Sequence, residues 1–128
     1  MKVIQELVAH FERQNKLTTD EIKALLDQGL LASEAPARIQ DLCDVPGTTF
    51  YFRVTGALAG SIWGTDIYTA DSNLAAAAVH AGVVTPGETA VVRVTVMPPL
   101  AHYQGSTRHG VSSHDFGRFD TAYRVDRL

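Results

Sequence analysis

The small-residue run LAAAAVHAG constrains the fold of this chain more than any other stretch. Alanine favours helix and adds almost no side-chain bulk, so a helix built on Ala75–Ala78 lets neighbouring elements approach its backbone closely. We therefore predict a central helix over about residues 72–81 that strands surround on most sides. The helix is predicted to run to Ala81 and to stop at Gly82, and Asp71 or Ser72 can accept hydrogen bonds from the free amides at the helix start.

Two stretches on either side of this helix have the two-residue periodicity of strands. They are TFYFRVT at 49–55 and TAVVRVTVM at 89–97. Alternation of β-branched and aromatic residues with other types is the strand signal. AYRV at 122–125 is predicted to be a final strand. One helix among several strands predicts an α+β fold.

The N-terminal part of the chain, residues 1–44, has helical periodicity instead. An apolar stripe recurs at helical spacing, formed by Val3, Ile4, Leu7, Val8 and Phe11. A second stripe consists of Ile22, Leu25 and Leu26, and Ser33 is expected to cap a third short helix that runs through Leu42. The chain therefore divides into a helical N-terminal segment, 1–44, and a mostly β domain, 45–128.

The first stripe predicts an interface. Short helices are marginal alone, and leaving a row of apolar side chains in water forfeits a large driving force. We expect Val3, Ile4, Leu7, Val8 and Phe11 to be covered by a second copy of the chain or by a recruited partner protein. Docking onto the sheet of the same chain is the alternative.

Composition narrows the location and the partners. The formal net charge is −3, which gives no general attraction to nucleic acid or to an anionic membrane. Cys43 is the single cysteine, so no disulfide forms within the chain. The first sixteen residues are charged throughout and do not have the pattern of a secretory signal, and no apolar window is long enough to span a membrane. These features predict a cytoplasmic protein without a nucleic-acid partner or transmembrane segment.

Three ordered blocks carry a family resemblance: SIWGTDIYTADSNLAAAAVHAGVV, YQGSTRHGVSS and FGRFDTAYRV. They resemble the LCCL domain over about residues 48–127. The resemblance implies a central helix embraced by two irregular β-sheets, with the N-terminal helices as an extension. Secreted members carry cysteines, one of them early in the helix, where this chain has Ala75. The chain is therefore predicted to be a bacterial, disulfide-free member.

The resemblance also implies a binding or assembly module that recognises a protein, glycan or lipid-type ligand. The predicted ligand-binding residues are Trp63, Tyr68, Asp71, His80, Tyr103 and Arg108. Trp63 and Tyr68 stack on a planar ligand or pack in the core. His80 lines a pocket beside them or bonds a carbonyl near the helix end. Arg108, with Arg118 and Arg124, recognises phosphate or carboxylate or forms surface ion pairs with Asp115, Asp120 and Asp126.

The sequence supports a catalytic site or a metal site less than it supports a binding module. Ser113, His114 and Asp115 are adjacent and cannot converge as a catalytic triad. Three histidines, His102, His109 and His114, lie in a turn-rich region without a compact metal-ligand spacing. Cys43 is expected to be a buried small hydrophobe. No cofactor is predicted. The competing hypothesis is an enzyme that binds a small substrate in a pocket near His80, Tyr68 and Asp71.

Overall fold

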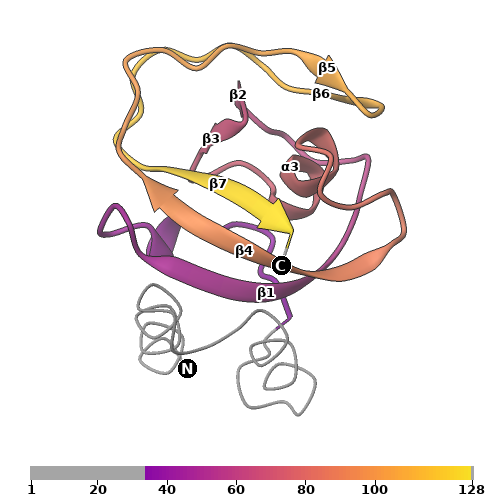
Figure 1. The fold of residues 1–128 in the computed structure, drawn as a ribbon. Helices are drawn as coiled ribbons and strands as arrows, with labels where there is room; N and C mark the ends of the chain where they lie inside the picture. Colours follow the sequence, from indigo (N-terminus) through magenta and orange to yellow (C-terminus); the bar gives the residue numbers. More distant parts are fainter. Residues whose placement is uncertain (1–33, 128) are drawn as a thin grey trace.

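The structure, a computed structural model, describes residues 34–127; the helices expected before residue 34 lie outside the described residues. A single α-helix of the described region, α3 (Leu74–His80), lies between two antiparallel sheets (Figure 1). The α+β class is confirmed. Within residues 34–127, no helix is both long and apolar enough to cross a membrane.

The larger sheet has the strand order β1-β4-β7-β3-β2. Its members are β1 (Thr49–Thr55), β2 (Gly64–Thr65), β3 (Ile67–Thr69), β4 (Thr89–Met97) and β7 (Ala122–Arg127). The smaller sheet pairs β5 (Thr107–Arg108) with β6 (Val111–Ser112). The strands predicted at 49–55 and 89–97 are confirmed at their stated bounds, and the predicted final strand extends to Arg127.

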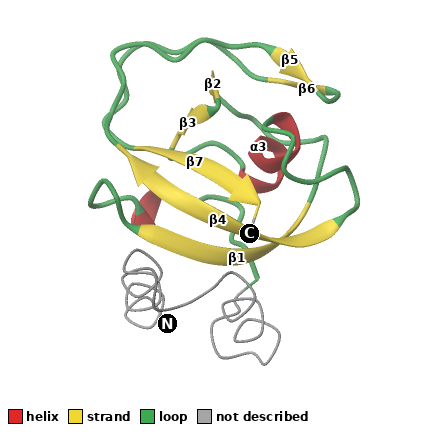
Figure 2. Cartoon of the chain, in the orientation of Figure 1, coloured by secondary structure: helices red, strands yellow, loops and turns green. Residues whose placement is uncertain are grey.

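Irregular segments join the two sheets (Figure 2). The chain that leaves β4 and the chain that returns to β7 run antiparallel, with isolated bridges at Leu100–Phe119 and Tyr103–Phe116. Tyr103 fixes this pair of segments, because its hydroxyl donates to the carbonyl of Phe119 at 3.1 Å and accepts from the amide of Leu100 at 3.1 Å. The small sheet is thereby held above α3.

Helix α3 is the centre of the core, as its alanines predict. Ala76, Ala77 and Ala78 have no exposed surface. One face of the helix meets the inward side chains of β1, and another meets the β5–β6 hairpin. A bulkier helix would hold these layers apart, so the alanine run sets the spacing between the two sheets.

The start of α3 corrects one prediction. The N-cap is Asn73, whose side chain accepts from the amide of Ala76 at 3.0 Å, rather than Asp71 or Ser72. The Ser72 hydroxyl accepts from the amide of Trp63 at 3.0 Å. That tertiary bond takes Ser72 away from the helix and leaves the capping role to its neighbour.

The segment before β1 corrects a second prediction. In place of the predicted helix through Leu42, the described residues before β1, 34–48, contain one 3₁₀ turn, η1 (Gln40–Leu42). Pro36 disfavours helical geometry at the preceding residue, and the Ala35 amide donates to the carbonyl of Arg53 at 3.0 Å. Ile39 and Cys43 are buried in the core, as expected for Cys43. The core therefore includes residues that the predicted division assigns to the helical N-terminal segment.

Candidate functional site

A buried hydrogen bond joins two of the predicted site residues. Tyr68 on β3 and His80 on α3 are both fully buried, and the Tyr68 hydroxyl lies 2.9 Å from Nδ1 of His80. Nε2 of His80 lies 3.0 Å from the carbonyl oxygen of Ser106. A carbonyl oxygen only accepts, so Nε2 carries the hydrogen and Nδ1 accepts from Tyr68.

Burial keeps this pair neutral. It lowers the pKa of His80 below its ordinary value of 6.5 and raises the pKa of the Tyr68 hydroxyl to about 12. Desolvation disfavours the charged form of each group. The pair is therefore suited to hold structure, with His80 bonding a nearby carbonyl as one of the two readings expected.

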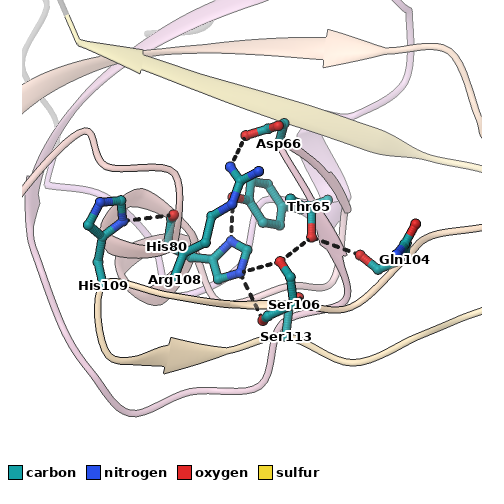
Figure 3. Close-up of polar contacts among 9 residues, drawn as sticks. Thr65, Asp66, His80, Gln104, Ser106, Arg108, His109 and Ser113 are labelled. Atoms are coloured by element: carbon teal, nitrogen blue, oxygen red, sulfur yellow. Dashed lines mark hydrogen bonds and ion pairs between the residues drawn. The ribbon is translucent and has the colours of Figure 1, made fainter.

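A chain of hydroxyls leads outward from His80 to the surface. The Ser106 hydroxyl lies 2.6 Å from that of Thr65, which donates to the carbonyl of Gln104 at 2.8 Å (Figure 3). Nδ1 of His109 donates to the carbonyl of His80 at 3.2 Å. These bonds fasten the β5–β6 hairpin to the end of α3 and to β2.

The outer end of this chain borders an open cavity of about 390 Å³. It is lined by Thr65, Ile67, Leu100, His102, Tyr103, Gln104, Gly105, Ser106 and Arg108. Tyr103 and Arg108 are therefore the predicted ligand-binding residues that line this cavity. Sequence analysis missed Thr65, Gln104 and Ser106, although Gln104 and Ser106 lie within the quoted block YQGSTRHGVSS.

Arg108 is the cation of this cavity. Its guanidinium donates to a carboxylate oxygen of Asp66 at 2.8 Å, and both side chains are substantially exposed. Asp66 has a φ of 67°, a left-handed conformation that costs energy in a residue other than glycine. Surface ion pairs of the three arginines with Asp115, Asp120 and Asp126 are one of the two predicted alternatives. Arg108 pairs with Asp66, outside that set, and Asp115 accepts from the amide of Gly105 at 2.6 Å.

Trp63 lies in a different aromatic group from Tyr68. Its ring is 6.3 Å from that of His114 and 6.5 Å from that of Phe116, centroid to centroid. The ring of Tyr68 pairs instead with those of His80 and Tyr123. The structure therefore does not bring Trp63 and Tyr68 together as two walls of one site.

Asp71 is also separate from the cavity. It is half-buried, and its Oδ1 atom has no hydrogen-bond partner among residues 34–127. Burial raises the pKa of Tyr123, and smaller electrostatic contributions from Tyr68, Cys43 and Asp71 act in the same direction.

The other candidate clusters do not converge. Ser113 bonds Ser106, and His114 packs beside Trp63. Within the described part of the chain, no group of three or more His, Cys, Asp or Glu side chains is placed to hold a metal ion. The expected surface pairs Arg118–Asp120, at 3.7 Å, and Arg124–Asp126, at 3.0 Å, are present.

Comparison with known proteins shows a family match and similarity to three proteins. Residues 38–122 match the family model of the LCCL domain. The chain is similar to the transcriptional regulatory protein rxt3 of Schizosaccharomyces pombe, with 39% identity over 59 residues, which cover 43% of this chain and 17% of that protein. It is also similar to clotting factor C of Tachypleus tridentatus and Limulus clotting factor C of Carcinoscorpius rotundicauda. Each is 34% identical over 68 residues, which cover 53% of this chain and 7% of the relative.

The chain thus spans at most 17% of the length of these relatives. All three come from eukaryotes, so the bacterial origin stays a prediction. The matched segments are small parts of proteins whose names describe different roles.

Proposed function

This chain belongs to the LCCL domain family, and on that premise we propose that it is a non-catalytic binding module for a protein, glycan or lipid-type ligand that carries an anionic group. The observation that carries this proposal is the open cavity beside Arg108. The occurrence of similar segments in a transcriptional regulatory protein and in clotting factors supports a module that is reused for recognition.

The buried network supports recognition over catalysis. Tyr68 and His80, the strongest acid–base candidates, have no exposed surface and use their polar atoms within the fold. A general acid or base must come within hydrogen-bond reach of its substrate. An enzyme pocket near His80, Tyr68 and Asp71 would therefore require α3 to separate from the hairpin.

Arg108 defines the chemistry of the ligand. A guanidinium has five N–H donors in a planar fork that matches carboxylate and phosphate. The bond from Arg108 to Asp66 uses one of the guanidinium nitrogens, Nη1. Thr65, Gln104 and Ser106 add hydroxyl, amide and backbone groups along the same cavity. We propose that an anionic group of the ligand bonds the free side of the guanidinium while Asp66 keeps the side chain in place.

Titration of the ¹⁵N-labelled full chain tests this proposal. The probes are inorganic phosphate, then vesicles of phosphatidylglycerol with phosphatidylcholine vesicles as the neutral comparison. Saturable shifts are expected at the Arg108 Nε–H group and at the backbone amides of residues 104–106. R108Q should abolish these shifts, whereas R118Q, which removes an exposed arginine outside the cavity, should retain them. Equal shifts in R108Q and the parent, or no saturable shift with any probe, would overturn the assignment.

The cellular location of the protein and the partner of its N-terminal stripe are separate proposals. We propose a cytoplasmic protein, which the single buried and free cysteine Cys43 supports. The predicted pairing of the N-terminal stripe with a second copy or a recruited protein concerns residues outside the described region.

A further inference from the structure

The face of the large sheet that points away from α3 has an unusual burial pattern. Along β1, Phe50 and Phe52 point into the core, so Tyr51 points to the opposite face. Arg93, its register partner on β4, places its guanidinium carbon 5.9 Å from the centre of the Tyr51 ring. Tyr51 nevertheless has 0% exposed surface.

Burial on this outer face increases toward the edge of the sheet. In the register row that crosses the sheet at Tyr51, Asp126 on β7 and Arg93 on β4 are half-buried, whereas Tyr51 on the edge strand β1 is fully buried. In a sheet with a bare face, the edge strand has a neighbour on one side only and is the most accessible. The reversed order is the pattern expected when a further segment covers the β1 side of this face.

The described residues nearest to this edge show where that chain begins. Glu34 forms a parallel bridge with Arg53 on the free edge of β1, and the Ala35 amide donates to the carbonyl of Arg53 at 3.0 Å. From Ala35 the chain continues to Ile39 in the core, on the other side of the sheet. Residues 1–33 therefore join the domain at the edge of the outer face, two positions along β1 from Tyr51.

We propose that residues 1–33 of the same chain cover this outer face, with the apolar stripe packed over the Tyr51 ring. The stripe is Val3, Ile4, Leu7, Val8 and Phe11. The aliphatic stems of Arg53 and Arg93 extend the apolar floor around Tyr51. At helical spacing Glu12 flanks the stripe, and its carboxylate complements the charge of these two arginines.

This assignment changes the expected use of the stripe. Docking on its own sheet buries the stripe without a second copy of the chain, so a dimer is not needed to satisfy it. It also covers the outer face of β1. The cavity beside Arg108 and the hairpin lie on the other side of the sheet, and they remain accessible to a ligand.

A spin label in the full chain distinguishes docking from dimerisation. Helical spacing places Arg13 opposite the stripe, so R13C carries the label without disturbing the contact. Native Cys43 can remain, because burial and the neighbouring Asp44 raise its pKa to about 12 and suppress its reaction with thiol reagents. Paramagnetic broadening is expected at the amides of Tyr51 and Arg93 and not at those of the β5–β6 hairpin.

A mixed sample separates the two sources of broadening. In this sample, ¹⁵N-labelled protein without a spin label is mixed with spin-labelled protein that is not enriched in ¹⁵N. Intramolecular docking then predicts no broadening of the ¹⁵N-labelled amides. Broadening in the mixture would show that a second copy covers the sheet and would overturn the proposal. Absence of broadening at Tyr51 in the singly labelled sample would overturn it as well.

Two charge substitutions give an independent readout. In the full chain, L7D with F11D should speed hydrogen exchange at β1 amides at least tenfold, while R13D on the opposite helical face should leave these rates within a factor of two. Light scattering should give the same mass for the parent and for both variants. Equal exchange rates in the two variants, or a mass that falls by half on substitution of the stripe, would contradict intramolecular docking.

Discussion

The phenolic oxygen of Tyr68 lies 2.9 Å from Nδ1 of His80, where neither side chain has any exposed surface. This bond joins β3 to α3, and the other ring nitrogen of His80 continues the connection to Ser106 at the start of the hairpin. One imidazole thus links a sheet, a helix and a second sheet. Its two nitrogens have different partners, so changes at either side have separable consequences.

Removal of the Tyr68 hydroxyl should destabilise the domain. Tyr68→Phe leaves the buried Nδ1 of His80 without a donor, and an unsatisfied buried polar group costs about 1–3 kcal/mol. Urea unfolding measures the loss. Thr55→Val is the comparison, because it removes a 2.7 Å bond to Thr89 that is exposed and that water can replace. Equal losses of unfolding free energy in the two variants would mean that the buried Tyr68–His80 bond stabilises the domain no more than an exposed bond does.

Stability should fall in mild acid because of His80. Its pKa in the folded state is lower than the ordinary value of 6.5, mainly through burial. The unfolded chain therefore takes up the proton more readily. The stabilisation is complete above about pH 6.5 and is lost as the pH falls from there toward the folded-state pKa. The hydrogen bond with the Ser106 carbonyl and the charge of Asp66 partly offset this lowering of the pKa, whereas Arg108 and His109 add to it.

Thermal unfolding between about pH 7.5 and pH 5.5, a range that brackets the ordinary histidine pKa, measures this dependence. His80→Gln should flatten the slope, because the side chain keeps a donor for the Ser106 carbonyl but no longer titrates. His102→Gln removes an exposed histidine and should preserve the slope. A slope that survives in His80→Gln would assign the effect to another group.

Gly105 should not tolerate a side chain. A Cβ atom there would lie 2.7 Å from both the carbonyl carbon of His114 and the carbonyl oxygen of Ser113. Because these are backbone atoms, we expect Gly105→Ala to cost about 1–3 kcal/mol through overpacking. Gly117→Ala is the matched change, with nothing within 4 Å of the new atom. It should be neutral or stabilise by up to about 1 kcal/mol, since alanine restricts the unfolded chain.

The helix centre should resist enlargement. Ala77 has no exposed surface, so Ala77→Leu is expected to lower stability by about 1–3 kcal/mol in guanidinium unfolding. Ala75, on the same helix, is half-buried and should accept leucine at a smaller cost. A similar cost at both positions would indicate that helix propensity, rather than the spacing of the sheets, determines the result.

The elements with strong local periodicity could be predicted from the sequence. Alternating β-branched and aromatic residues, bounded by turn residues, predicted the first and last residues of β1 and β4. The alanine run located α3 and its burial. Local pattern could not choose among Asp71, Ser72 and Asn73 as the cap, because all three types can cap a helix. The choice depends on the Trp63 amide, which bonds Ser72 across the fold.

The candidate site was less predictable, because its contacts connect distant parts of the chain. The Arg108–Asp66 pair joins residues 42 positions apart, and the Thr65–Ser106 bond joins residues 41 apart. No periodicity specifies such a pairing. Trp63 and Tyr68 are close in sequence, yet the turn between β2 and β3 sends their rings into different clusters. Family resemblance identified Tyr103 and the chemistry of the guanidinium group identified Arg108, whereas neither indicated which of the six residues share a cavity.

The position of β7 has a kinetic consequence. This strand lies between β4 and β3 in the large sheet, although it is the last in sequence of the seven strands between residues 34 and 127. Pairing between strands distant in sequence requires closure of long loops and slows folding. While the chain is being synthesised, β4 and β3 therefore have no common neighbour until residues 122–127 leave the ribosome. The facing edges of β4 and β3 are open to pairing with other chains during that interval, and a chaperone that binds extended segments would have its greatest effect then.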